Sequence, residues 1–103
     1  MNSNELLVVD IAEAIRRITV YVSGVEKERF FVDILIQDAV IRNLEIIGEA
    51  AKKISDEYRE QHADIPWREM AGLRDVLIHN YGSVDLYIVW KTSSNHIMTR
   101  LQL

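Results

Sequence analysis

The sequence has 103 residues, 49% of them hydrophobic, and carries 12 Lys and Arg against 16 Asp and Glu, a formal net charge of −4. This size and composition predict one globular domain over residues 1–103 and exclude a disordered tail and a membrane protein. The absence of Cys excludes a disulfide scaffold and a thiolate metal site. We expect no signal peptide and a cytoplasmic location.

The acidic balance argues against a general polyanion binder, because sequence-independent affinity for nucleic acid depends on Lys and Arg neutralising phosphates. The charges are unevenly distributed along the chain. Residues 1–51 hold nine acidic and five basic side chains, whereas residues 52–103 hold seven of each. We therefore expect any anion-binding site in the second half of the sequence.

The first half of the sequence has apolar residues at helical spacing. This pattern predicts a helix over Glu5–Val22, ended by Gly24, and a second helix from about residue 30 to about Tyr58. The second helix would be about 40 Å long and apolar on two flanks. It packs either between two other segments of its own chain or against a second copy in a homodimer. Gly48 would let another backbone approach it closely.

The second half predicts two more helices. Pro66 and Trp67 mark the start of a third helix that runs to about His79. Residues 80–83 interrupt the pattern, and we expect Ser83 to cap a last helix with Asp85 in its first turn. That helix would direct four apolar side chains inward: Leu86, Trp90, Ile97 and Leu101. The sequence therefore predicts an all-α protein.

Arg74 has an unusual position in the third helix. A helical projection places it in the middle of an apolar face that also holds Trp67, Met70, Ala71, Leu77 and Ile78. A buried guanidinium needs anions or carbonyls around it, because an unpaired buried charge costs several kcal/mol. Arg74 is therefore either a ligand-binding residue or the partner of Glu45 or Glu49 in a buried ion pair.

His79 lies four residues after Asp75, so the carboxylate can orient the imidazole and favour its protonated form. Arg74 and His79 are five apart, about 140° around an ideal helix. They meet only if the helix loosens near Asn80 or the long Arg side chain wraps round. Spacing alone favours a capping or core role for His79 over a catalytic one.

The spacing of Arg74, His79 and Tyr81 resembles the R-x4-H-x-Y signature of the HepT-like branch of the HEPN (higher eukaryotes and prokaryotes nucleotide-binding) superfamily. Further blocks agree with that family in order and spacing: Asp10-Ile11, Ala14-Ile15, Arg17-Ile18, residues 37–51, Ile65–Arg68, Val84-Asp85 and Trp90. The resemblance covers nearly the whole chain. One departure is Asp75, which stands where many relatives have Asn.

The resemblance implies an antiparallel four-helix bundle, usually homodimeric, that acts as a ribonuclease toxin. It implies an RNA substrate and a minimal nucleotidyltransferase antitoxin as partner. Arg74 and His79 would be the catalytic residues, with Asp75 and Asn80 in support, and the partner would attach AMP to the hydroxyl of Tyr81. It implies neither a metal nor another cofactor.

These residue types fit metal-independent RNA cleavage. Attack by the 2′-OH on the adjacent phosphorus needs a base, an acid and a group that stabilises the phosphorane. His79 can move protons near neutral pH, and Arg74 is a permanently charged phosphate ligand. One chain supplies one such His, so a two-fold dimer would supply both acid and base.

Two alternatives remain open. The chain could be a non-catalytic nucleotide- or protein-binding helical module that partners a nucleotidyltransferase, or a structural helical dimer in which Arg74 forms a buried ion pair. Several other polar and aromatic residues have simpler expected roles. Trp67 and Trp90 are expected to be core anchors, Arg42 to pair with Glu45 or Glu49, Asn43 to lie on a solvated face or line the cleft, and His62 and His96 to be surface residues.

Overall fold

The computed structural model describes residues 2–77 and 84–94, and every regular element among them is a helix. In chain order these are α1 (Ser3–Val22), α2 (Lys27–Phe30), α3 (Ile34–Lys53), α4 (Asp56–Gln61), α5 (Trp67–Leu77) and α6 (Leu86–Ser94). Four of them have nine residues or more, while α2 and α4 have four and six. The predicted all-α class is confirmed. No described helix is both long and apolar enough to span a bilayer.

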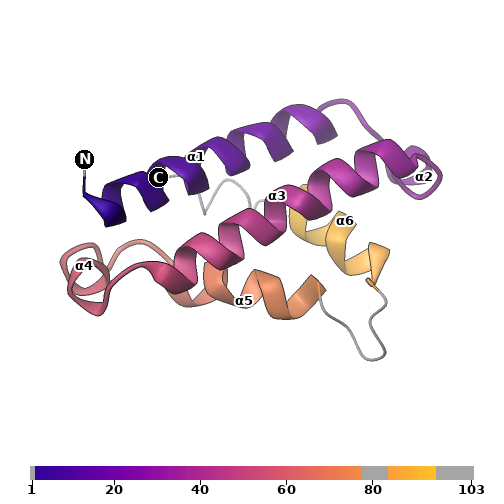
Figure 1. Cartoon of the computed structure of the whole chain (residues 1–103). Coiled ribbons are helices and arrows are strands. Elements are labelled where there is room, and N and C mark those ends of the chain that lie inside the picture. Colours follow the sequence, from indigo (N-terminus) through magenta and orange to yellow (C-terminus); the bar gives the residue numbers. More distant parts are fainter. Residues whose placement is uncertain (1, 78–83, 95–103) are drawn as a thin grey trace.

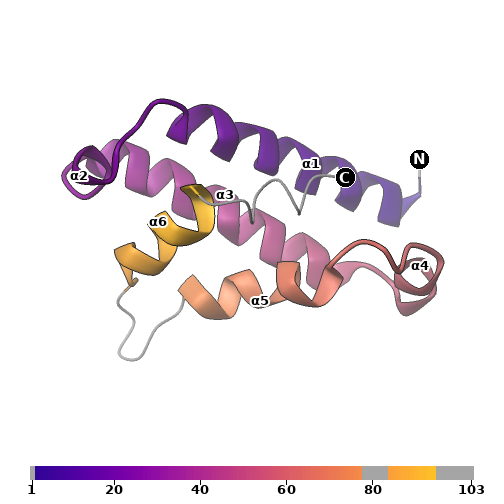
Figure 2. The ribbon, with the colours of Figure 1, turned by 180° about the vertical axis from the view of Figure 1, so that it is seen from behind.

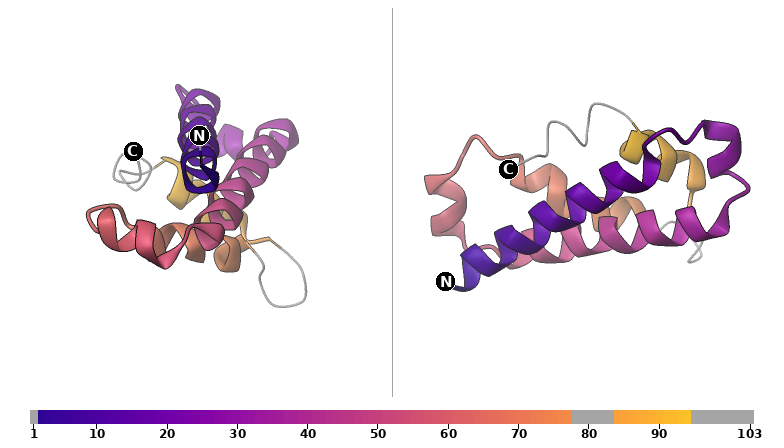
Figure 3. Two further views of the ribbon diagram at one scale, coloured as in Figure 1. Left: turned by 60° about the vertical axis from the view of Figure 1, so that its left-hand side comes forward. Right: turned by 90° about the horizontal axis from the view of Figure 1, so that it is seen from above.

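Helix α3 is the centre of the arrangement. It runs antiparallel to α1, and α5 returns along its other side (Figure 1). Helix α6 lies across the end of α3 nearest α2, as the reverse view shows (Figure 2). The left-hand view in Figure 3 shows α1 and α5 on different sides of α3. The chain therefore packs its own segments on two sides of the central helix, which is one of the two alternatives that its apolar flanks predicted.

A polar cap at Asn2 and a turn at Gly24 define the two ends of α1. The side chain of Asn2 accepts a hydrogen bond from the Glu5 N–H (2.8 Å), and the Glu5 carboxylate accepts one from the Asn2 N–H (3.3 Å). This reciprocal pair satisfies N–H groups that the first turn leaves without partners. After Val22 the chain turns at Gly24, whose φ of 72° is a conformation that glycine adopts without strain.

The expected helix from residue 30 to Tyr58 is wrong in its bounds. Asp33 caps α3 by accepting a hydrogen bond from the Ile36 N–H (3.1 Å), so α2 and α3 are separate helices. At the other end Ile54 is extended and Ser55 accepts from the Tyr58 N–H (3.2 Å), which starts α4. Short polar side chains that can cap a new helix break the apolar pattern at both points.

Helices α5 and α6 begin close to their predicted positions. The Pro66 carbonyl accepts from the Met70 N–H (3.0 Å) at the start of α5. Asp85 caps α6 by accepting from the N–H groups of Tyr87 (3.0 Å) and Ile88 (3.3 Å), so it has the capping role expected of Ser83. The expected end of α5 at His79, together with Ser83, Ile97 and Leu101, lies outside the described residues.

The core lies between α3 and the helices packed against it, α1, α5 and α6. Its most completely buried side chains are Ile11, Ile15, Ile18, Phe30, Val40, Leu44, Ile47, Met70 and Val89. Trp67 is buried and its indole N–H donates to the His62 carbonyl (3.0 Å), while the Trp90 ring packs on Phe30 at 5.2 Å between centroids. Both tryptophans are therefore core anchors, as predicted.

Gly48 is the point of closest approach between α3 and α5. A Cβ added to it would lie 2.9 Å from the Arg74 backbone nitrogen and 3.0 Å from the Arg74 Cβ. Real Cβ atoms essentially never approach other atoms more closely than 3.0 Å, so only glycine fits here without a shift of α5. The close approach predicted for Gly48 is confirmed, and the backbone that makes it is that of Arg74.

We predict that Gly48→Ala lowers the free energy of unfolding by about 1–3 kcal/mol, because the new methyl group must push α5 away from α3. Gly72→Ala is the matched control: it lies in α5, and its added Cβ would meet nothing within 4 Å. The control should stay neutral or gain up to about 1 kcal/mol from helix propensity. Urea unfolding of both variants checks this, and equal stabilities would contradict it.

Candidate functional site

The side chain of Arg74 is exposed, which corrects the expectation that it lies in the middle of an apolar face. The buried stripe of α5 runs through Met70, Leu73 and Leu77, which are 0%, 7% and 3% exposed. Because Trp67 and Met70 stay buried while Leu73 takes the place of Arg74 on the buried face, α5 is rolled from the projection by less than the 100° of one residue. Its roll sets the backbone and Cβ of Arg74 against Gly48, and the rest of the side chain continues to the surface.

The alternative in which Arg74 forms an ion pair with Glu45 or Glu49 is not found among the described residues. Glu45 pairs instead with Arg42 on its own helix, at 3.6 Å, as predicted for Arg42. Within residues 2–77 and 84–94, Arg74 has no ion pair. It is therefore an exposed guanidinium available to an external anion. The structure therefore does not support the alternative in which Arg74 is a buried ion-pair partner.

A second pair lies beside it. The Nζ of Lys52, near the end of α3, is 3.8 Å from Oδ1 of Asp75, the residue after Arg74. We use the term α3–α5 seam for Glu45, Gly48 and Lys52 of α3 together with Arg74 and Asp75 of α5. Along this seam Glu45 and Lys52 lie on opposite sides of Gly48, and each has a partner of opposite charge. Arg74, at Gly48, has none in the part of the chain that the structure describes.

The rest of the signature follows directly after α5. His79, Asn80 and Tyr81 lie outside the described residues, so their geometry stays a prediction. The sequence predicted that the carboxylate of Asp75 orients the imidazole of His79. Its carboxylate is 76% exposed and contacts Lys52, a partner 23 positions away that no local spacing rule indicates.

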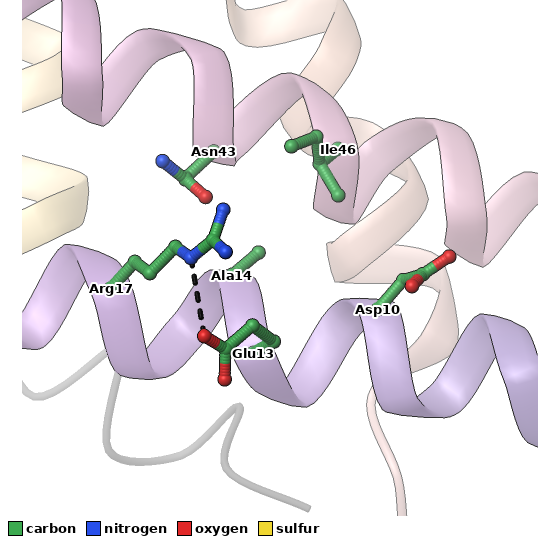
Figure 4. A pocket seen from close by; sticks show the side chains of 6 residues that line it. All are labelled: Asp10, Glu13, Ala14, Arg17, Asn43 and Ile46. Atoms are coloured by element: carbon green, nitrogen blue, oxygen red, sulfur yellow. Dashed lines mark hydrogen bonds and ion pairs between the residues drawn. The ribbon is translucent and has the colours of Figure 1, made fainter.

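Asn43 does not line the seam. It is only 5% exposed and faces α1, where it borders a hollow of about 310 Å³ with Asp10, Glu13, Ala14, Arg17 and Ile46 (Figure 4). Its Nδ2 donates to the Ala39 carbonyl (2.8 Å), and its buried Oδ1 has no hydrogen-bond partner. Because Asn43 is five residues from Gly48, it lies about 140° around α3 from the seam. The solvated face expected for it is wrong.

The hollow at Asn43 is electrostatically different from the seam. The Glu13 carboxylate binds Arg16 (2.7 Å) and Arg17 (3.2 Å). The hydrogen bond from Arg16 is the main cause that lowers the pKa of Glu13 to about 2, so this carboxylate stays ionised at neutral pH. The spacing of three and four residues between Glu13 and the two arginines is the sequence signal for this pairing.

The described residues contain no group of three His, Cys, Asp or Glu side chains placed to hold a metal ion. His62, expected at the surface, is partly buried: its ring stacks on Tyr58 at 4.1 Å, and its Nδ1 lies 3.0 Å from the Tyr58 carbonyl. His96 lies outside the described residues. Of the three histidines, His79 is the nearest to Arg74 in sequence.

The sequence of the chain is similar to a known protein family and to several of its members. Residues 11–102 match the family described as Ribonuclease HepT-like. The chain belongs to this family. The match spans both helices of the seam and the segment that holds His79 and Tyr81, and it confirms the resemblance drawn from the R-x4-H-x-Y pattern.

Relatives support the same assignment. The chain is 50% identical over 88 residues to a Thermococcus cleftensis protein named "Probable ribonuclease HepT", which covers 85% of this chain and 80% of that relative. A Caldanaerobacter subterraneus subsp. tengcongensis relative whose name also includes RNase is 48% identical over 71 residues, 69% of this chain and 63% of the relative. The chain thus spans less than two thirds of that second relative. No solved structure matches.

Proposed function

We propose that this member of a ribonuclease family is a metal-independent endoribonuclease and the toxin of a toxin–antitoxin pair. The observation that carries the proposal is Arg74: an exposed guanidinium, without an ion pair among the described residues, fixed against α3 at Gly48 and first in the R-x4-H-x-Y segment. A forked guanidinium binds phosphate oxygens bidentately and keeps its charge at any physiological pH.

The proposed reaction uses a nucleophile that RNA itself carries. A base removes the 2′-OH proton, the 2′ oxygen bonds to the adjacent phosphorus, and the bond from phosphorus to the 5′ oxygen breaks as an acid protonates that oxygen. The products are a 2′,3′-cyclic phosphate and a 5′-OH. Arg74 stabilises the negative charge on the phosphorane, and His79 transfers protons.

Each chain supplies one His79, so acid and base would come from two copies in a homodimer. An apolar surface at the α2–α3 end supports such a dimer. We call it the α3 apolar end: Phe31, Val32, Ile34 and Leu35, which are 36%, 79%, 69% and 79% exposed. Leu35 also borders a hollow of about 330 Å³ with Tyr21, Ile36 and Ala39. A protruding side chain beside a hollow is what a two-fold, self-complementary interface needs.

The proposed partner is a minimal nucleotidyltransferase that neutralises the toxin by attaching AMP to Tyr81. This part of the proposal depends on the motif, since Tyr81 lies outside the described residues. The attached phosphodiester is an anion seven residues from Arg74 in sequence. It would bind the guanidinium in place of the RNA backbone, so modification would block substrate binding as well as cleavage.

The first functional prediction is that Arg74→Ala and His79→Ala each abolish RNA cleavage, while EDTA leaves wild-type activity intact and mass spectrometry finds 2′,3′-cyclic phosphate ends. Arg74→Ala should change the free energy of unfolding by less than about 0.5 kcal/mol, because its side chain is exposed. The neighbouring Leu73→Ala, at a buried position, is the control and should cost about 2–5 kcal/mol.

Two outcomes contradict this proposal. Activity lost in EDTA and restored by magnesium would show metal-dependent chemistry. A wild-type protein that binds a nucleotide through Arg74 but cleaves no RNA would instead support the non-catalytic binding module.

A second prediction concerns the dimer. Sedimentation at micromolar concentration should give twice the 12.0 kDa chain mass, and Leu35→Asp should give monomers because it places a charge in the α3 apolar end. Leu6→Asp is the matched control. Leu6 is 53% exposed and lies near the start of α1, which is the end of α1 farther from α2. A wild-type monomer that still cleaves RNA would refute both the interface and the shared site.

A third prediction concerns Tyr81. Tyr81→Phe should keep most of the nuclease activity, because the phenol takes no part in the proposed proton transfers, but should escape neutralisation. Intact-mass measurement after incubation with the nucleotidyltransferase, ATP and magnesium should show one AMP on the wild type and none on the variant. An adduct that persists in Tyr81→Phe, or one that leaves cleavage unchanged, contradicts the assignment.

A further inference from the structure

The α3–α5 seam contains a second cation close to Arg74. Lys52 follows Gly48 by four residues, so it lies about 6 Å further along α3 and within about 40° of the same face. Gly48 contacts the backbone of Arg74, and Lys52 contacts the carboxylate of Asp75 at 3.8 Å. Two independent contacts therefore locate Lys52 beside the Arg74 site.

The Lys52–Asp75 pair is easily opened. The Lys52 side chain is 45% exposed and that of Asp75 is 76% exposed, and the distance of 3.8 Å is long for an ion pair. Pairs this exposed are weak because water and salt screen them. A phosphate near the seam can therefore bind the Lys52 ammonium in place of Asp75.

We propose that Lys52 forms a second phosphate-binding subsite, which binds the RNA phosphate next to the one held by Arg74, and that Asp75 is its counterion when RNA is absent. This inference rests on the proposed ribonuclease function. Consecutive phosphates of a single strand need consecutive cations along the protein surface. Arg74 offers a rigid fork to one phosphate, and Lys52 offers a flexible point charge that adapts to its neighbour.

The other cations of α3 are less suited to this role. Arg42 is about 120° around the helix from Gly48 and pairs with Glu45 on its own helix. Lys53 is about 140° from Gly48, on a different face. Lys53 has the same side chain, adjoins Lys52 in sequence and is also exposed. It is therefore a matched control for the effect of removing one positive charge from the same end of α3.

This subsite also gives Asp75 a role. A neutral side chain such as Asn at position 75 could not hold Lys52 by charge. Asp75 would therefore weaken RNA binding in this chain, because the phosphate must compete with a carboxylate for the same ammonium. Asp75→Asn should strengthen RNA binding, and the gain should be smaller when Lys52 is absent.

The experiment measures binding of a single-stranded 2′-O-methyl oligoribonucleotide, which presents RNA phosphates but lacks the 2′-OH nucleophile and is not cleaved. Fluorescence anisotropy between about 50 and 200 mM salt gives the affinity and its salt slope. Lys52→Ala should weaken binding several-fold and reduce the slope by about 0.7, the value for one phosphate contact on a single strand. Lys52→Arg should restore the slope, and Lys53→Ala should leave it unchanged.

A double-mutant cycle of Lys52→Ala with Asp75→Asn measures the coupling between the two residues. Equal effects of Lys52→Ala and Lys53→Ala, or an Asp75→Asn gain that does not depend on Lys52, would overturn the subsite. Arg74→Ala separates this failure from a larger one. If Arg74→Ala also leaves binding unchanged, the proposed ribonuclease site itself is wrong; if Arg74→Ala weakens binding and Lys52→Ala does not, only the Lys52 subsite is wrong.

Discussion

The contact between Gly48 and the backbone of Arg74 is the constraint on which the candidate site depends. Because no side chain separates α3 from α5 at this point, the two helices approach closely, and Arg74 is held at its Cα while its guanidinium extends to solvent. The same approach buries Met70, Leu73 and Leu77 of α5 in the core. The packing of α5 on α3 and the position of Arg74 thus have one cause.

That contact requires α3 to be held in register, and polar contacts at its ends provide this. Asp33 caps its start, and Arg59 of α4 donates to the Ala51 carbonyl in its last turn (2.6 Å). The Asn4 side chain bonds Ser55 twice, as a donor to Oγ (3.0 Å) and as an acceptor from N–H (3.1 Å). Residues 51 positions apart therefore tie the start of α1 to the end of α3, which limits sliding between the two long helices.

Local sequence patterns were sufficient for the helical class, the tryptophan anchors and the close approach at Gly48, because each depends on spacing or residue size. They failed where two signals compete. Ile54 continues an apolar pattern, yet Ser55 can cap a new helix and does. The roll of α5 differs from the projection, since a projection of α5 alone does not include the contact between Gly48 and Arg74. The Lys52–Asp75 pair joins two helices and has no local signature.

The central position of α3 has an electrostatic consequence. On one side, the Glu13 carboxylate of α1 is ionised and is paired with both Arg16 and Arg17. On the other side, the seam presents Arg74 without an ion pair among the described residues. A phosphate can therefore bind Arg74 without displacing a carboxylate, whereas it would have to compete with Glu13 for Arg16 or Arg17. The two sides of α3 thus differ in how accessible their guanidinium groups are to an anion, and the acidic net charge of the chain limits binding at other parts of its surface.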